Sequence, residues 1–255
     1  MIRVIKIGGR AQGDPALASA IAAVHMRGDW VCVVHGGGDE VSQLQRKLGA
    51  EPTFFNGRRV TTEGDLTVVR MVLSGTVNKR LVGALLQAGV PAVGVSGEDG
   101  NLLSCTRFGQ GELGAVGVPE RVDPAMLHAL LAAGFVPVIS PLGRFANGEG
   151  CNVNGDDAAA AIAGALGADD LIFVADVPGV LNENGEAIPT LDDDSITALI
   201  SSGVANGGMI AKLESARLAL DVGVERVRIG NLTAISDRTA GTALLATRNS
   251  PARRI

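Results

Sequence analysis

The sequence predicts an α/β protein with a mainly parallel sheet, and three observations support this class. Short apolar segments such as 31–34 and 171–175 are typical of strands that are buried on both faces. Segments with helical apolar spacing separate these strands, and such alternation favours parallel pairing. Glycine-containing turns directly follow several strands, at the edge where open α/β sheets bind ligands.

Composition excludes several functional classes. The chain has 255 residues, of which 46% are hydrophobic, enough for one large domain or two smaller ones. A net charge of −5, few aromatic residues and no basic run beyond Arg253-Arg254 argue against nucleic-acid binding. We expect neither a membrane span nor a secretory leader. Cys32, Cys105 and Cys151 form no CxxC pair and the histidines are scattered, so we expect reduced cytoplasmic thiols and no metal site.

The first strand, expected at residues 2–7, contains a lysine among apolar residues. Lys6 would lose its hydration there unless an anion met it. Gly8 and Gly9 let the backbone turn and present its N–H groups, which would suit a phosphate. The alternative is an edge strand with a solvent-reaching lysine and an ordinary turn, and this stretch alone favours the alternative.

A second glycine turn follows the next strand. We expect a helix over 14–28, begun by an Asp-Pro pair, a strand over 31–34 and a helix over 41–48. His35-Gly36-Gly37-Gly38 would place free N–H groups and the positive end of a helix dipole just past the strand. Neither GxxxxGK[ST] nor GxGxxG is present. A tight turn and an anion site remain equally good interpretations of these glycines.

The middle of the chain continues the alternation. Asn56-Gly57 predicts a hairpin turn, and Thr62 with Asp65 predicts a capping box. The only possible break lies between 139 and 151. The other elements that we expect here are helices over 62–73, 77–87 and 123–131, strands over 91–95 and 135–139, and a surface hairpin over 106–117.

Two amides and two carboxylates precede the apolar helix expected over 158–166. Asp156 or Asp157 would by default be its N-cap. Asn152 and Asn154 alternate along an extended segment, so both would face one side and suit a ligand with several oxygens.

The C-terminal part supplies one more strand-end turn and a second unusual lysine. Asp176-Val177-Pro178-Gly179 follows the strand over 171–175. A hairpin is expected at 184–185. Lys212 lies shortly after a glycine pair, in a helix that extends to Gly223, and alone it is most often a solvated residue. We also expect a helix from 192 and strands over 227–229 and 242–245.

Six short motifs occur in a fixed order over essentially the whole chain. They are Lys6–Gly9, His35–Gly38, Asn56–Thr61, Val77–Lys79, Asn152–Asp156 and Gly208–Lys212. As a set they resemble the amino-acid kinase family, and within it the members that phosphorylate N-acetyl-L-glutamate. The resemblance implies a three-layer αβα sandwich around one continuous sheet. Residues 1–150 would bind the acyl amino acid and form the dimer, and residues 151–255 would bind ATP.

The activity implied by the resemblance is transfer of the γ-phosphoryl group of ATP to the side-chain carboxylate, the second step of arginine biosynthesis. A carboxylate is already ionised at neutral pH and needs no general base. Two anions must approach each other, which positioned cations and amides permit. Each full charge about 4 Å away contributes about 4 kcal/mol at an effective dielectric of 20. Mg²⁺ would arrive with ATP, since the sequence offers no all-protein cage.

The resemblance also implies roles for single residues. Lys6 would reach the phosphoryl group from the acceptor side and Lys212 from the ATP side, while Asp156 would hold both lysines. Amides near Gly9 and Gly37 would contact the phosphoryl oxygens, and Arg59 would clamp the non-reacting carboxylate. The remaining acceptor-site residues would be Gly37, Gly38, Asn152 and Asn154, and the nucleotide-site residues would be Gly8, Asp176, Gly179, Gly208, Met209 and Lys212.

Two departures and three alternatives accompany this resemblance. Gly155 stands where the family usually has alanine, and the extra N-terminal helix of arginine-inhibited members is missing. We therefore expect a homodimer without arginine feedback. One alternative is a kinase for aminoadipate or glutamate on a carrier protein, which a basic surface around the acceptor site would favour. The others are a non-catalytic amino-acid or nucleotide sensor, against which Lys6, Asp156 and Lys212 argue, and a dehydrogenase, against which the absent GxGxxG argues.

Overall fold

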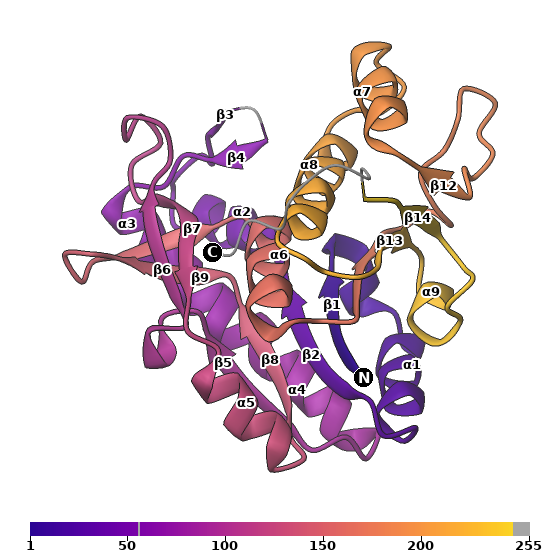
Figure 1. Cartoon of the computed structure of the whole chain (residues 1–255). Coiled ribbons are helices and arrows are strands. Elements are labelled where there is room, and N and C mark those ends of the chain that lie inside the picture. Colours follow the sequence, from indigo (N-terminus) through magenta and orange to yellow (C-terminus); the bar gives the residue numbers. More distant parts are fainter. Residues whose placement is uncertain (56, 247–255) are drawn as a thin grey trace.

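The computed structural model describes residues 1–55 and 57–246, and eight strands within that range form one sheet (Figure 1). Asn56 of the expected hairpin turn and the Arg253-Arg254 pair lie outside the described residues. All neighbouring strands are parallel except β13 and β14. In sheet order the strands are β12 (Thr190–Leu191), β14 (Thr242–Leu244), β13 (Val227–Gly230), β11 (Asp170–Val174), β1 (Ile2–Ile7), β2 (Trp30–His35), β8 (Val136–Ser140) and β5 (Ala92–Ser96).

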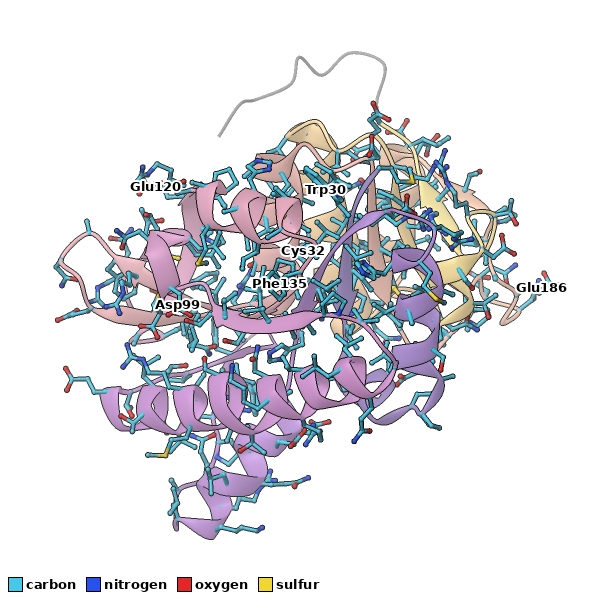
Figure 2. The ribbon with its side chains drawn as sticks, turned by 90° about the horizontal axis from the view of Figure 1, so that it is seen from below. Trp30, Cys32, Asp99, Glu120, Phe135 and Glu186 are labelled. Atoms are coloured by element: carbon cyan, nitrogen blue, oxygen red, sulfur yellow. The ribbon has the colours of Figure 1, made fainter. Side chains whose placement is uncertain are left out.

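The sheet has a separate apolar core on each face, as a three-layer αβα sandwich requires. Val4 and Phe173 belong to one core, and Ile5 belongs to the other. The first core is covered by α5 (Ala125–Ala132), α6 (Gly155–Leu166) and α8 (Gly208–Asp221), and the second by α1 (Ala16–His25), α4 (Asn78–Gln87) and α9 (Thr233–Ser236). Figure 2 shows Cys32 of β2 in the interior and Glu120 and Glu186 at the surface. The predicted fold class is confirmed.

Helix ends follow their capping residues, with one correction. The capping box of Thr62 and Asp65 begins α3 (Glu63–Arg70), as predicted. The default expectation that Asp156 or Asp157 caps α6 is wrong, because Asn154 is the N-cap. Its side-chain oxygen accepts hydrogen bonds from the main-chain N–H groups of Asp156 at 2.8 Å and Asp157 at 3.4 Å. Both carboxylates are thereby left for other partners.

The two helices expected over 62–73 and 77–87 are one continuous helical segment. A π-helical stretch, η2 (Met71–Val77), joins α3 directly to α4. The wider turns shift the phase of the apolar pattern, so the sequence resembles two separate helices. Leu73 and Val77 of this stretch are buried against the glycine turn after β2.

A small second sheet lies beside the large one (Figure 1). Its closed set of strands comprises β6 (Leu103–Arg107), β7 (Val116–Val122), β9 (Leu142–Phe145) and β10 (Gly150–Val153). The hairpin expected over 106–117 is therefore half of this sheet, with Cys105 and Val116 buried inside. The possible break after residue 139 is instead the β9–β10 pair, which the sequence did not reveal.

Three further elements complete the description around the strand ends. The hairpin of β3 (Phe54–Phe55) and β4 (Arg58–Arg59) pairs with no other strand among the described residues, and α2 (Gly38–Lys47) follows the glycine turn after β2. Asp192 caps α7 (Asp193–Ser201), as the sequence predicts. None of the described helices has the length and apolar character needed to cross a membrane.

Candidate active site

Two lysines from distant parts of the chain meet on one carboxylate. Lys6 lies on the face of β1 that α6 covers, Asp156 lies in the first turn of α6, and Lys212 lies early in α8. The Lys6 ammonium is 2.6 Å from Asp156 Oδ1, and the Lys212 ammonium is 3.2 Å from Oδ2. We call this group the lysine cluster; it joins three residues that the sequence singled out separately.

The lysine cluster is buried and carries excess positive charge. Burial favours protonation of Asp156, but the two ammonium groups outweigh it and hold the pKa of this carboxyl below its usual value. The pKa of Lys212 is lowered, first by burial and then by repulsion from Lys6, which attraction to Asp156 only partly offsets. Two cations around one anion leave about one uncompensated charge, which a buried site accommodates best when an anionic ligand binds.

The glycines after β1 leave open space beside the lysine cluster. A Cβ atom at Gly8 would lie 3.7 Å from the Lys6 ammonium and 4.0 Å from that of Lys212. At Gly9 it would meet no atom within 4 Å, so packing within the described residues does not require glycine there. The absence of a side chain at both positions keeps the backbone accessible to a ligand, in line with the phosphate interpretation.

The glycine turn after β2 is explained by close packing. Gly37 has a φ of 145°, and a Cβ atom there would lie only 2.7 Å from Leu73 Cδ2 of η2. Glycine is therefore required at this position on two grounds. Gly38 begins α2, so its N–H group lies at the positive end of that helix.

A cavity of about 160 Å³ lies next to the lysine cluster, and most of the residues that line it come before residue 150. A Cβ atom at Gly155, which lines this cavity, would lie 3.3 Å from Lys6 Cε. The cavity therefore ends beside a cation. Its other walls include Gly37, Gly38, Arg59, Asn152 and Asn154, which are the predicted acceptor-site residues.

The guanidinium group of Arg59 is held in place at the wall of this cavity. It donates hydrogen bonds to the carbonyl oxygen of Gly38 at 2.7 Å, to Ser42 Oγ at 2.8 Å and to Gln45. Gln45 in turn donates to the Asp65 carboxylate. Burial lowers the pKa of Arg59 from its usual value, and the charge of Asp65 opposes this change. Three of five donors are used, so two remain for a ligand.

The two predicted asparagines have different surroundings. Asn152 Nδ2 donates to Thr61 Oγ1 at 3.1 Å, and the Thr61 hydroxyl donates to the carbonyl oxygen of Arg59 at 3.0 Å. This orientation leaves the side-chain oxygen of Asn152 as an acceptor. The oxygen of Asn154 already caps α6, so this residue can offer only its amide N–H groups to a ligand.

A buried pair that the sequence did not assign supports the glycine turn. His35 Nδ1 donates to the carbonyl oxygen of Gly36 at 2.7 Å, and its Nε2 lies 3.2 Å from Asn78 Nδ2. Asn78 also donates to the carbonyl oxygen of Val138 in β8. Burial lowers the pKa of His35 to about 4, so the ring is neutral at physiological pH. Both residues belong to motifs that the sequence singled out, His35–Gly38 and Val77–Lys79, but nothing in the sequence indicated that they lie together.

The predicted nucleotide-side residues do not all lie at the lysine cluster. Asp176 follows β11 and lines a second, polar cavity of about 390 Å³ with Asn231 and Thr233. Gly179 packs away from the cluster, because a Cβ atom there would lie 2.6 Å from Thr242 Oγ1. Gly208 begins α8 next to open space, whereas the side chain of Met209 packs against the apolar core.

Some contacts of the site come from residues that sequence reasoning missed. Ser42 and Gln45 fix Arg59, and Arg58 forms an ion pair with Asp157. In the described part of the chain, no group of three or more His, Cys, Asp or Glu side chains is placed to hold a metal ion.

A three-layer fold with two lysines on one carboxylate at its strand ends offers a buried cationic site that suits an anionic ligand such as a phosphate. The model of the amino acid kinase family matches residues 1–231. The chain belongs to the amino acid kinase family.

Within this family, the relatives that the chain resembles are acetylglutamate kinases. The enzyme of Geobacillus stearothermophilus is 45% identical over 89% of this chain and 88% of its own length. That of Jannaschia sp. is also 45% identical, over 87% of this chain and 79% of its own.

Solved structures show the same fold. The smu.665 protein of Streptococcus mutans superposes with a TM-score of 0.88 at 31% identity, covering 96% of this chain and 99% of the other. Carbamate kinase of Giardia lamblia superposes with a TM-score of 0.73 at 19% identity, over 96% of this chain and 98% of its own, which is evidence for the fold alone.

Proposed function

We propose that the protein phosphorylates the side-chain carboxylate of N-acetyl-L-glutamate with ATP, giving N-acetylglutamyl 5-phosphate in arginine biosynthesis. The observation that carries this proposal is the position of the lysine cluster next to the cavity that Arg59 lines. The acetylglutamate kinases to which the chain is 45% identical support the same acceptor.

The lysine cluster would stabilise the transferring phosphoryl group. Lys6 borders the acceptor cavity through Gly155, so it would act on the acceptor side, and Lys212 would act on the ATP side. Asp156 touches both ammonium groups and is held ionised, so it would position them rather than remove a proton. The acceptor carboxylate is already ionised, and the required catalysis is the approach of two anions. Main-chain N–H groups near Gly9 and Gly37 would add donors to the phosphoryl oxygens.

The cavity walls suit the two ends of N-acetylglutamate. The positive charge of Arg59 and its unused N–H groups, on Nε and Nη1, suit a carboxylate that does not react. The free side-chain oxygen of Asn152 suits the N–H group of an acetamide. With Gly37, Gly38 and Asn154 as further walls, residues 1–150 would hold most of the acceptor site.

Residues 151–255 would hold most of the nucleotide site. Gly8, Gly208 and Lys212 border the cluster on this side, and Asp176 lies at the adjacent polar cavity. Met209 would contribute through its backbone at the start of α8, and Gly179 through the shape of the turn after β11. Mg²⁺ would be held by phosphate oxygens and water and would arrive with ATP.

A carrier-bound acceptor is disfavoured by the charges near the cavity. A carrier of acidic character would need a basic surface around the cavity. Of the two arginines that line it, Arg58 is 2.8 Å from Asp157 and Arg59 is buried. A sensor without catalysis would not need two lysines on one buried carboxylate.

We also propose that the protein is a cytoplasmic homodimer without arginine feedback. All three cysteines are free and buried, as expected in a reducing compartment. Strand β5 forms one edge of the large sheet, and the exposed apolar residues Met71 and Leu86 lie on the helical segment beside it. Such an edge is commonly covered by a second copy. Analytical ultracentrifugation that detected a hexamer would contradict this assembly.

The function is tested by trapping acyl phosphate with hydroxylamine. N-acetylglutamate, glutamate, aspartate and aminoadipate are offered side by side with ATP and Mg²⁺. We expect product with N-acetylglutamate and little with the other three. Comparable activity on free glutamate or aminoadipate would contradict the acceptor assignment, and no activity on any of them would favour the carrier or the sensor.

A further inference from the structure

A chain of polar contacts crosses from the β3–β4 hairpin to two helices. Arg58 Nη1 of β4 lies 2.8 Å from Asp157 Oδ2 of α6. The other carboxylate oxygen, Asp157 Oδ1, accepts a hydrogen bond from Ser215 Oγ of α8 at 2.8 Å. The guanidinium group of Arg58 also lies over the ring of Phe108, with its carbon 4.8 Å from the ring centre.

Each member of this chain neighbours a residue of the candidate active site. Arg58 precedes Arg59, and Asp157 follows Asp156. Ser215 lies three residues after Lys212, which places both on one side of α8 about one turn apart. One set of contacts therefore joins the three elements that carry Arg59, Asp156 and Lys212, namely β4, α6 and α8.

The side chains of Arg58 and Arg59, rather than a sheet or an apolar core, hold this hairpin to the rest of the chain. Its two strands pair only with each other among the described residues, and it stands out from the two sheets (Figure 1). Phe54 and Phe55 are each 52% exposed, so no apolar core fixes the hairpin. The main chain is anchored at its base, where Val60 N donates to the carbonyl oxygen of Thr53 and Thr61 N to that of Leu113.

The electrostatics of this contact favour a connection that can open. The side chains of Arg58 and Asp157 are 22% and 14% exposed, so both charges keep some water when they pair. A pair of this kind is stronger than a surface pair and costs less desolvation than a buried one. Ser215, which is buried, donates to the other carboxylate oxygen, so the two helices fix the orientation of Asp157 independently of Arg58.

We propose that Arg58, Asp157 and Ser215 form a latch that holds the β3–β4 hairpin closed over the acceptor cavity. The latch rests on the proposed function, and its members are positioning residues: they place Arg59 against the bound acceptor and touch no reacting atom. Because Arg58 belongs to the acceptor side and its partners to the ATP side, closing the hairpin couples acceptor binding to the helices that carry Asp156 and Lys212.

The test compares Arg58→Leu, Asp157→Asn and the double variant with the wild type. We expect each single variant to raise KM for N-acetylglutamate about 10-fold, which corresponds to about 1.4 kcal/mol, and to change kcat and KM for ATP much less. The double variant should match the singles, because both break one interaction. The effect of salt on KM should be smaller in all three variants than in the wild type, because only the screening of the bound acceptor remains.

A second measurement follows the hairpin without any substrate. Hydrogen–deuterium exchange of the segment over 53–60 should be faster in both single variants than in the wild type. Arg217→Leu is the matched control, because Arg217 is 26% exposed and forms an ion pair with Asp193 away from the cavity. This control should leave KM for the acceptor and the exchange of the hairpin unchanged.

The outcomes separate the latch from the proposed function. An unchanged KM, additive effects in the double variant, or unchanged exchange of the hairpin would overturn the latch. So would a rise in KM that simply follows a fall in melting temperature. If the wild type did not phosphorylate N-acetylglutamate, the proposed function would fail, while the exchange experiment would still decide whether the hairpin is latched.

Discussion

Two clusters of charge share strand β1, and they differ in the type of cation and in the acceptors that the protein supplies to it. Near the start of the strand, Arg3 lies 3.0 Å from Asp29 and 3.6 Å from Asp170. Arg228 lies 2.8 Å from Asp170 and also donates to two main-chain carbonyl oxygens. Two arginines thus meet two carboxylates, and the partly exposed N-terminal ammonium group, 3.5 Å from Asp29, adds a third cation. At the other end of the strand, the lysine cluster has two cations and one carboxylate.

The difference shows which buried charges hold the fold and which await a ligand. An arginine guanidinium group donates hydrogen bonds in several directions, so carboxylates and carbonyl groups of the protein itself serve as its partners in the first cluster. Lysine ammonium groups are compact point charges, and the lysine cluster leaves one of them uncompensated. Mutations in the first cluster should therefore affect stability, and mutations in the second should affect turnover.

The largest effect is expected for the lysines. Lys6→Ala and Lys212→Ala should each lower kcat by about 10²- to 10³-fold, because each removes a preorganised charge from the transferring group. KM for N-acetylglutamate should change far less, and the melting temperature should not fall. Steady-state kinetics measures both constants. The control is Lys47→Ala, because Lys47 is an exposed lysine at the end of α2. A main effect on KM would contradict the role in phosphoryl transfer.

The next effect should appear in stability alone. Asp170→Asn removes the carboxylate shared by Arg3 and Arg228, so the buried Arg228 loses its only carboxylate partner among the described residues and Arg3 keeps Asp29 alone. We expect the free energy of unfolding in urea to fall by about 3–5 kcal/mol, with kcat of the folded enzyme retained. Asp193→Asn, at an exposed partner of Arg217, should cost less than about 1 kcal/mol. Equal losses in the two variants would remove the distinction between the clusters.

A smaller effect is expected for the acceptor clamp. Arg59→Ala should raise KM for N-acetylglutamate by about 10- to 100-fold, the range for one or two charge-assisted hydrogen bonds. Turnover at saturating acceptor should fall less, since Arg59 contacts no phosphoryl oxygen in this proposal. If turnover fell while affinity held, the clamp assignment would be wrong.

The last effect is confined to acid pH and concerns the buried His35. Its pKa is near 4 in the folded protein and 6.5 when unfolded, so below pH 6.5 the unfolded chain binds the proton more readily. Stability should therefore decline from pH 6.5 down to 4, by about 3 kcal/mol in total from this group. Urea unfolding is measured at a series of pH values. The decline should be absent in His35→Asn and retained in His128→Asn, which changes an exposed histidine. Identical profiles for the two variants would refute the assignment.

The sequence predicted the residues with a local signal and missed those defined by distant contacts. Lys6 and Lys212 stood out because each follows or precedes a glycine pair in an otherwise apolar setting. Arg58 and Asp157, by contrast, lie far apart in the chain, and neither has a neighbour that marks it as paired. Only the folded chain brings them together.

Local signals also misled where two residues competed for one role. Asp156 is a good N-cap by type, yet Asn154 takes that position and frees Asp156 for the lysines. The π-helical segment η2 hid the continuity of α3 and α4, because it changes the period on which the prediction depends. The short strands β9 and β10 are too brief for an alternating pattern to be recognised.

The most direct test of the lysine cluster is the affinity for a transition-state analogue. Binding of Mg·ADP with aluminium fluoride in the presence of N-acetylglutamate is measured for the wild type and for Lys6→Ala. We expect the variant to bind this combination about 100-fold more weakly while it binds ADP and N-acetylglutamate almost normally, because the charge acts mainly on the transferring group. Equal loss of affinity for the separate substrates, or no loss for the analogue, would contradict the proposed role of the cluster.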